Sequence, residues 1–110
     1  MLLASSYNNI YIRNLSDELI QSCENFDQDT SPDLIAERAQ KIRDQWKSHR
    51  SFVQITVNHT EIELINNAID EFCVYAQFGD EADFQRAKQL AVNALEELRQ
   101  SEVLFPTNIL

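Results

Sequence analysis

Apolar residues recur along this chain with the three- and four-residue spacing of helices that are buried on one face. The clearest stretch, residues 58–104, is divided by Gly79, the single glycine. Before it, one apolar stripe comprises Ile62, Ile65, Ala68, Ile69, Phe72, Cys73 and Ala76. After it, a second comprises Phe84, Ala87, Leu90, Ala91, Ala94, Leu95 and Leu98. The pattern predicts a helical hairpin that turns at Gly79-Asp80, with the glycine at positive φ and Asp80 as N-cap.

Two more helices are predicted in the first half of the chain. The first covers residues 4–28, where the apolar seam consists of Tyr7, Ile10, Tyr11, Leu15, Leu19, Cys23 and Phe26. Ser31 followed by Pro32 is a typical helix start and opens a second helix over residues 32–57. Its seam consists of Ile35, Ala39, Ile42, Trp46, His49 and Val53.

The hydrophobic register slips near Asn58, which predicts a break before a third helix over residues 59–78. Asn58 with Glu61, or Thr60 with Glu63, would form the capping box; one long bent helix across the break is the alternative. A fourth helix is predicted over residues 81–104, ended by Pro106, with an apolar tail folding back. We therefore expect one all-α domain over residues 1–110, an antiparallel bundle of three to four helices with a C-terminal hairpin.

Composition agrees with this fold and excludes some functions. One glycine and two prolines among 110 residues favour helices over turn-rich sheets. Eighteen acidic residues against nine basic ones give a net charge of -9, which argues against nucleic-acid binding. Cys23 and Cys73 lie on apolar faces and are expected to be buried thiols rather than a disulfide. The start of the chain is too short and polar for a signal peptide or a membrane span.

The most conspicuous chemical motif is His59-x-Glu61, which zinc deaminases also contain. Those enzymes also need a P-C-x-x-C element, which this sequence lacks, so helix capping is the preferred interpretation. A looser metal site from His59, Glu61 and Glu63 would have no soft ligand. His49 is expected to be hydrogen-bonded to a carbonyl or a carboxylate rather than to act as a base. We therefore predict no catalytic residue, no metal and no cofactor.

A second candidate is basic. Arg43, Lys47 and Arg50 share one face of the second predicted helix, beside Trp46. Such a strip could contact anionic lipid headgroups or an acidic protein. The preferred interpretation is charge pairing, within the helix and with acids of the third helix.

Taken together, Trp46, the His59-x-Glu61 step, Gly79-Asp80 and the Asn-Ile-Leu end resemble the family called domain of unknown function 4363. Its members are short proteins, mostly of spore-forming Firmicutes, with an N-terminal membrane helix before a helical domain. The resemblance covers residues 7–110 and implies no activity, because none is established for the family. This chain lacks the membrane helix. If an anchor was trimmed, the resemblance implies an extracytoplasmic membrane surface; otherwise a cytoplasmic location is expected.

The leading hypothesis is a noncatalytic structural or protein-interaction module. Its protein partner, whose identity the sequence does not give, would bind a groove between helices or the face carrying Arg43 and Lys47. One alternative is a metal-dependent or hydrolytic enzyme with a concave polar pocket around His59. The other is a self-associating bundle, which an exposed seam of Tyr7, Ile10 and Tyr11 would favour.

Overall fold

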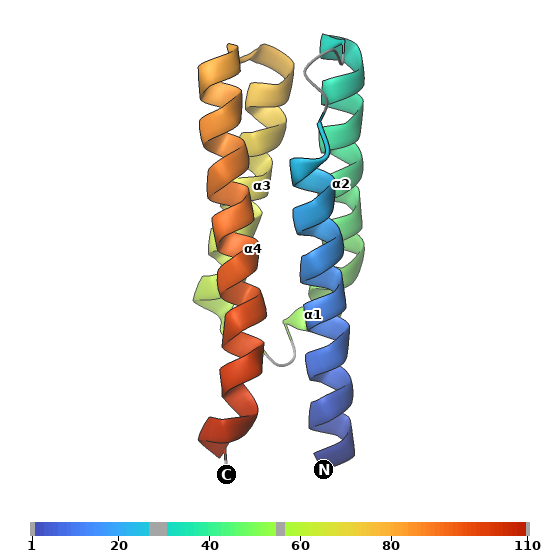
Figure 1. The fold of residues 1–110 in the computed structure, drawn as a ribbon, viewed down its shortest axis with the longest axis vertical. Helices are drawn as coiled ribbons and strands as arrows, with labels where there is room; N and C mark the ends of the chain where they lie inside the picture. The colour runs from blue at the N-terminus through green and yellow to red at the C-terminus, as the bar shows by residue number, and fades with distance from the viewer. Residues whose placement is uncertain (1, 27–30, 55–56, 110) are drawn as a thin grey trace.

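The fold is an antiparallel bundle of four helices, as a computed structural model of the chain shows (Figure 1). The structure describes residues 2–26, 31–54 and 57–109, and of residues 2–9 and 101–109 only the backbone. The helices are α1 (Leu2–Glu24), α2 (Pro32–Val53), α3 (His59–Phe78) and α4 (Glu81–Ile109). Together they form a rod of 48 × 20 × 20 Å. The predicted all-α class and the C-terminal hairpin are confirmed.

The helices form a closed ring in which α4 lies between α1 and α3, and α2 packs against α3. Although α1 and α2 are neighbours in sequence, they share the smallest interface of the bundle. The α1–α2 and α3–α4 connections lie at one end of the rod, and both chain termini lie at the other (Figure 1). The first helix is thus held mainly by the last one.

Side-chain caps define where the helices begin. Ser31 Oγ accepts a hydrogen bond from the Leu34 N–H at 3.4 Å, and Pro32 is the first helical residue, as predicted. Asn58 Oδ1 accepts from the Thr60 N–H at 2.8 Å and starts α3. The predicted break between α2 and α3 is therefore confirmed, and the alternative of one long bent helix is wrong.

Most residues of the predicted stripes of α2 and α3 are buried, while Ile35, His49 and Ala68 are partly buried. Among the described residues, the buried apolar core comprises Ile12, Leu15, Leu19, Cys23, Ala39, Ile42, Trp46, Val53, Val57, Ile62, Ile65, Ile69, Phe72, Cys73, Ala76, Phe84, Ala87, Ala91, Val92, Leu95 and Leu98. Two positions were predicted wrongly, because neighbouring apolar residues leave the phase of the stripe ambiguous. Ile10 is 58% exposed while Ile12 is fully buried, and Leu90 is exposed while Val92 is buried.

Gly79 ends α3 in a way the sequence does not predict. Its φ of -85° and ψ of 162° are extended, so the expected positive φ is wrong. A Cβ at this position would lie 2.7 Å from Tyr75 Cδ1 and 2.9 Å from the Tyr75 carbonyl oxygen. Glycine is favoured here because the turn brings its Cα against the preceding helical turn. Asp80 is the N-cap predicted for α4, since its Oδ1 accepts from the Asp83 N–H at 2.8 Å.

Three helix ends differ from the prediction. Helix α1 ends at Glu24 rather than at 28, where residues 27–30 lie outside the described chain. Helix α2 ends at Val53 rather than at 57, and Val57 is buried beyond the helix. Helix α4 continues through Pro106 to Ile109, so the fold-back of residues 107–109 is wrong, while Leu110 lies outside the described residues. A proline lacks only one hydrogen-bond donor, and its cost of about 3 kcal/mol does not always end a helix.

Candidate functional site

The best candidate site is a cavity at the end of the rod that carries the α1–α2 and α3–α4 connections. We call it the end cavity; its volume is about 280 Å³. All four helices or their flanking residues contribute to its lining, which consists of Phe26, Pro32, Ile35, Tyr75, Ala76, Gly79, Asp80, Glu81, Phe84 and Gln85. The cavity therefore lies between residues of the first and second halves of the chain.

Aromatic rings form the inner wall of the end cavity. The ring of Phe26 meets those of Phe72 and Phe84 edge-on, with centroids 5.8 and 5.6 Å apart. The rings of Phe72 and Phe84 are stacked at 5.3 Å. Such arrangements are favourable beyond the apolar area they bury. Because Phe72 is fully buried behind the other two rings, the wall is anchored in the core.

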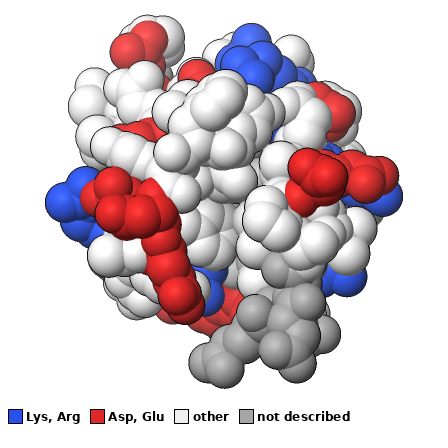
Figure 2. Space-filling view, turned by 90° about the horizontal axis from the view of Figure 1, so that it is seen from above, with Lys and Arg blue, Asp and Glu red and all other residues white. Residues whose placement is uncertain are grey.

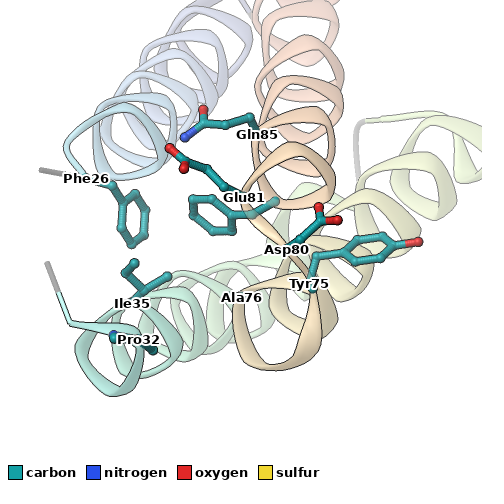
Figure 3. Close-up of a pocket in the computed structure, with 10 residues that line it drawn as sticks. Phe26, Pro32, Ile35, Tyr75, Ala76, Asp80, Glu81 and Gln85 are labelled. Carbon is teal, nitrogen blue, oxygen red and sulfur yellow. The ribbon is translucent and has the colours of Figure 1, made fainter. Parts of the chain in front are cut away.

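The rim of the end cavity is polar on the α4 side (Figure 3). The side chains of Glu81 and Gln85 extend from α4 toward α1, over the aromatic wall. Ile35 points into the cavity from α2, while the Tyr75 hydroxyl points away from it. The end cavity therefore combines an apolar interior with a carboxylate and an amide at its mouth.

Acidic side chains surround this end of the molecule. Figure 2, which looks down on the end, shows an uncharged centre with Asp and Glu side chains around it and basic side chains at the margin. Phe78, the last residue of α3, is 83% exposed beside this turn. A single exposed apolar side chain is common on protein surfaces, so Phe78 by itself does not indicate a binding site.

Two further hollows lie on the sides of the bundle. One of about 670 Å³ is lined by Ser22, Asn25, Arg38, Lys41, Ile42 and Gln45. The other, of about 310 Å³, is lined by Asp17, Ile20, Glu96, Arg99 and Gln100. Polar groups at both already have partners in the chain: Lys41 lies 3.9 Å from Glu37, and Arg99 Nε donates to Asp17 at 2.7 Å. These hollows are weaker candidates than the end cavity.

The predicted metal candidates do not converge on a site. His59 Nε2 lies 3.3 Å from Glu63 Oε1, one helical turn away, and both side chains are mostly exposed. Within the described residues, no group of three His, Cys, Asp or Glu side chains is arranged to hold a metal ion. His59 lines none of the three cavities. None of these three cavities is therefore the concave polar pocket around His59 that the enzyme alternative requires.

Two of the three residues of the predicted basic face, Arg43 and Arg50, have polar partners on α3. Arg43 Nε lies 2.8 Å from Asp70 Oδ1, close enough for an ion pair although outside hydrogen-bond geometry. Arg50 Nη1 donates to Asn66 Oδ1 at 3.5 Å, and Trp46 Nε1 donates to the same oxygen at 2.6 Å. We call this set the α2–α3 polar seam. Charge pairing with α3 is thus confirmed for Arg43, and Lys47 is exposed beside it.

His49 is hydrogen-bonded, but not to the partner expected. Its Nδ1 pairs with the Tyr11 hydroxyl of α1, which donates when the imidazole proton is on Nε2. The Tyr11 ring also packs against Phe52 at 4.7 Å, and its burial raises the pKa of the hydroxyl. Of the predicted seam for self-association, only Ile10 is clearly exposed, while the side chain of Tyr7 lies outside the described residues.

Both thiols are free and buried, as predicted. Cys73 Sγ donates to the Ala39 carbonyl oxygen at 3.2 Å. Burial raises the pKa of Cys23 to about 12 and that of Cys73 to about 11, with nearby charges making smaller changes in both directions. Since the thiolate is the reactive form, neither cysteine is suited to nucleophilic chemistry at neutral pH.

Comparisons with known proteins add no relatives. No protein-family model matches the chain, and neither the curated proteins nor the solved structures contain a match. The family resemblance therefore stays a prediction. Among the described residues, no helix combines the length and the hydropathy needed to cross a membrane.

The hydrophobic pattern predicts that the apolar wall residues of the end cavity are buried, but it does not predict the cavity. Phe26, Ile35, Phe84 and Ala76 were all assigned to core faces, whereas the structure shows that they line a hollow. A signal was present: phenylalanines cluster beside the two connections, at positions 26, 78 and 84. Whether those rings seal the end or leave a space depends on side-chain packing that periodicity does not describe.

Proposed function

We propose that this protein is a noncatalytic interaction module that binds a segment of another protein at the end cavity. One observation carries the proposal: the cavity opens at the surface with an apolar, aromatic interior and a polar rim. Interfaces owe most of their binding energy to a few bulky side chains seated in such pockets.

The arrangement of the other candidate groups supports the same choice. His59 and Glu63 form an exposed helix-surface pair, and the two described thiols are buried and neutral. Near Trp46, Arg43 faces Asp70 and Arg50 donates to Asn66, so both have partners within the α2–α3 polar seam. By contrast, no other side chain of the described residues fills the end cavity. Tethering at a membrane surface is a separate proposal, which rests on the family resemblance alone.

A selection experiment tests the proposal. A random dodecapeptide phage library is selected on the immobilised full chain, and enriched peptides are measured by fluorescence anisotropy. Gln85→Trp places a bulky ring at the mouth of the cavity, where Gln85 is exposed. Gln89→Trp, one turn farther from the end and outside the cavity lining, is the matched control.

We expect enriched peptides to share a bulky apolar position and to bind Gln85→Trp about tenfold more weakly than the unaltered chain. Gln89→Trp should change their affinity by less than about twofold. The proposal is overturned if no peptide is enriched, or if enriched peptides bind both variants and the unaltered chain equally. Circular dichroism of both variants confirms that the bundle is retained.

A further inference from the structure

The charges around the end cavity indicate what kind of segment fits it. The described end segments, residues 24–26, 31–34 and 78–85, contain acidic residues and no lysine or arginine. The acids are Glu24, Asp33, Asp80, Glu81 and Asp83. Figure 2 shows an uncharged centre at this end, with separate acidic patches around it and basic patches between them. A segment bound here therefore meets negative charge on several sides.

Some of these acids have a role in the fold. Asp80 caps α4, and Asp83 lies 3.2 Å from Arg86 Nη2. Asp33 and Glu81 lie in the first turns of α2 and α4, where the helix dipole favours a carboxylate. In the described part of the chain, however, Glu81 forms no ion pair, and its carboxylate projects over the cavity mouth.

Two helix C-terminal ends at this end of the rod lack a basic side chain. Helices α1 and α3 both end here, and neither has a basic residue in its last turn. Glu24, which lies in the last turn of α1, has the sign that the dipole disfavours. Arg86, the first base along α4, lies 3.2 Å from Asp83, and Lys88 comes two residues later. Lys88 lies near Cys23, whose pKa is raised by burial and partly lowered by the Lys88 charge. No ion pair of Lys88 with these acids occurs among the described residues, so a bound cation would be favoured.

The size of the end cavity limits what enters it. A volume of about 280 Å³ lies at or below the lower limit of roughly 300–1,000 Å³ that is typical of pockets for drug-sized molecules. The space suits one bulky apolar side chain instead. The Phe26 and Phe84 rings offer apolar surface to such a side chain, and aromatic faces also tolerate a neighbouring cation.

Building on the proposed function, we infer that the end cavity takes one bulky apolar side chain of a partner segment, with Lys or Arg beside it in that segment. The apolar side chain enters the aromatic pocket, and the flanking cations face Glu81 and the carbonyl ends of α1 and α3. This occupant satisfies both features of the site at once. A small organic cation would leave much of the apolar wall exposed, and a second copy of this acidic chain would bring like charges together.

Three designed peptides test the inference on the full chain labelled with ¹⁵N. Each is a Gly/Ser-rich decapeptide with a central Lys-Trp-Lys, Glu-Trp-Glu or Lys-Ala-Lys, titrated at about 0.15 M salt so that only short-range charges act. Amide shifts locate the peptide, and anisotropy gives its affinity. The variants are Glu81→Lys and Glu97→Lys, which change net charge equally; Glu97 is exposed on α4 and outside the cavity lining.

We expect Lys-Trp-Lys to shift the amides of Phe26, Ile35, Ala76 and Phe84 and to bind about tenfold more tightly than either other peptide. Glu81→Lys should remove most of that advantage and improve binding of Glu-Trp-Glu, while Glu97→Lys should leave the ranking unchanged. Lys-Ala-Lys binding as well as Lys-Trp-Lys would show attraction to net charge alone and overturn the inference.

The remaining outcomes separate this inference from the proposed function. If Glu-Trp-Glu binds the cavity as tightly as Lys-Trp-Lys, the charge selectivity is wrong and the interaction module stands. The same holds if none of the three binds but phage-selected peptides do. If tetramethylammonium produces the same shifts as Lys-Trp-Lys, the site is one for small cations. Peptide-sensitive dimerisation in analytical ultracentrifugation would instead identify a second copy as the occupant. Both results overturn the inference.

Discussion

The α2–α3 polar seam and the end cavity use similar residues in opposite ways. Each combines aromatic side chains with nearby charges. In the seam, Trp46 and Arg50 share the Asn66 oxygen, and Arg43 faces Asp70, so the polar groups find partners across two helices. At the end cavity, Glu81 projects over an aromatic wall without an ion-pair partner in the described chain. Paired charges thus specify how helices pack, whereas unpaired charges beside an apolar hollow are available to a ligand.

The largest loss of stability is expected from a substitution in the wall of the end cavity, which tests whether that wall belongs to the core. Phe72→Ala removes a fully buried ring that stacks on Phe84 and meets Phe26, and should lower the free energy of unfolding by about 3–5 kcal/mol. Urea unfolding followed by circular dichroism measures it. A loss below about 1 kcal/mol would mean that the wall contributes little to the fold.

The next prediction breaks the polar seam. Asn66→Ala leaves the Trp46 indole N–H without its acceptor at a buried side chain, which should cost about 1–3 kcal/mol. Asn67→Ala, at the exposed neighbouring position, should change stability by less than about 0.5 kcal/mol. Equal values for the two variants, from the same urea titration, would show that the seam does not hold α2 to α3.

A third prediction concerns how stability depends on pH through the two buried thiols, one near the polar seam and one near the end cavity. Cys73 contacts α2 through Ala39, and Cys23 lies one turn before Phe26. Their folded pKa values, about 11 and about 12, are raised above the ordinary 9.0. Because unfolded thiols ionise first, the stabilisation is complete below pH 9 and is lost as pH rises toward the folded values.

We therefore expect the free energy of unfolding to fall by on the order of 1 kcal/mol per thiol on going to about pH 10. Chemical denaturation at several pH values measures the slope. Cys23→Ala should flatten the curve, since it removes the more strongly shifted thiol. A curve with the same slope in the variant would exclude Cys23 as its source.

The smallest expected effect concerns the Arg43–Asp70 pair. Both side chains are partly exposed, at 33% and 49%, so solvent screens their attraction. A double-mutant cycle with Arg43→Ala and Asp70→Ala should give a coupling of about 0.2–1 kcal/mol that decreases with salt. Coupling above about 2 kcal/mol would contradict this expectation and place the pair among buried ion pairs.

The sequence predicted the bundle because helix signals are local. Ser31-Pro32, Asn58 and Asp80 each start a helix through side-chain hydrogen bonds within a few residues. Packing determined what the sequence left open. Adjacent apolar residues at positions 10–12 did not indicate which one is buried, and the role of Gly79 depends on its distance from Tyr75. The end cavity was not predicted, since it arises where four helix ends from distant parts of the chain meet.

The antiparallel ring has a practical consequence for how the molecule can be mounted. Helix α1 begins and α4 ends at the same end of the rod, opposite the end cavity (Figure 1). A tag or linker fused at either terminus would therefore attach the bundle to a support by the end opposite the end cavity. The end cavity would project into solution, separated from the support by nearly the 48 Å length of the rod. The chain can therefore be immobilised through its N-terminus or its C-terminus without covering the end cavity.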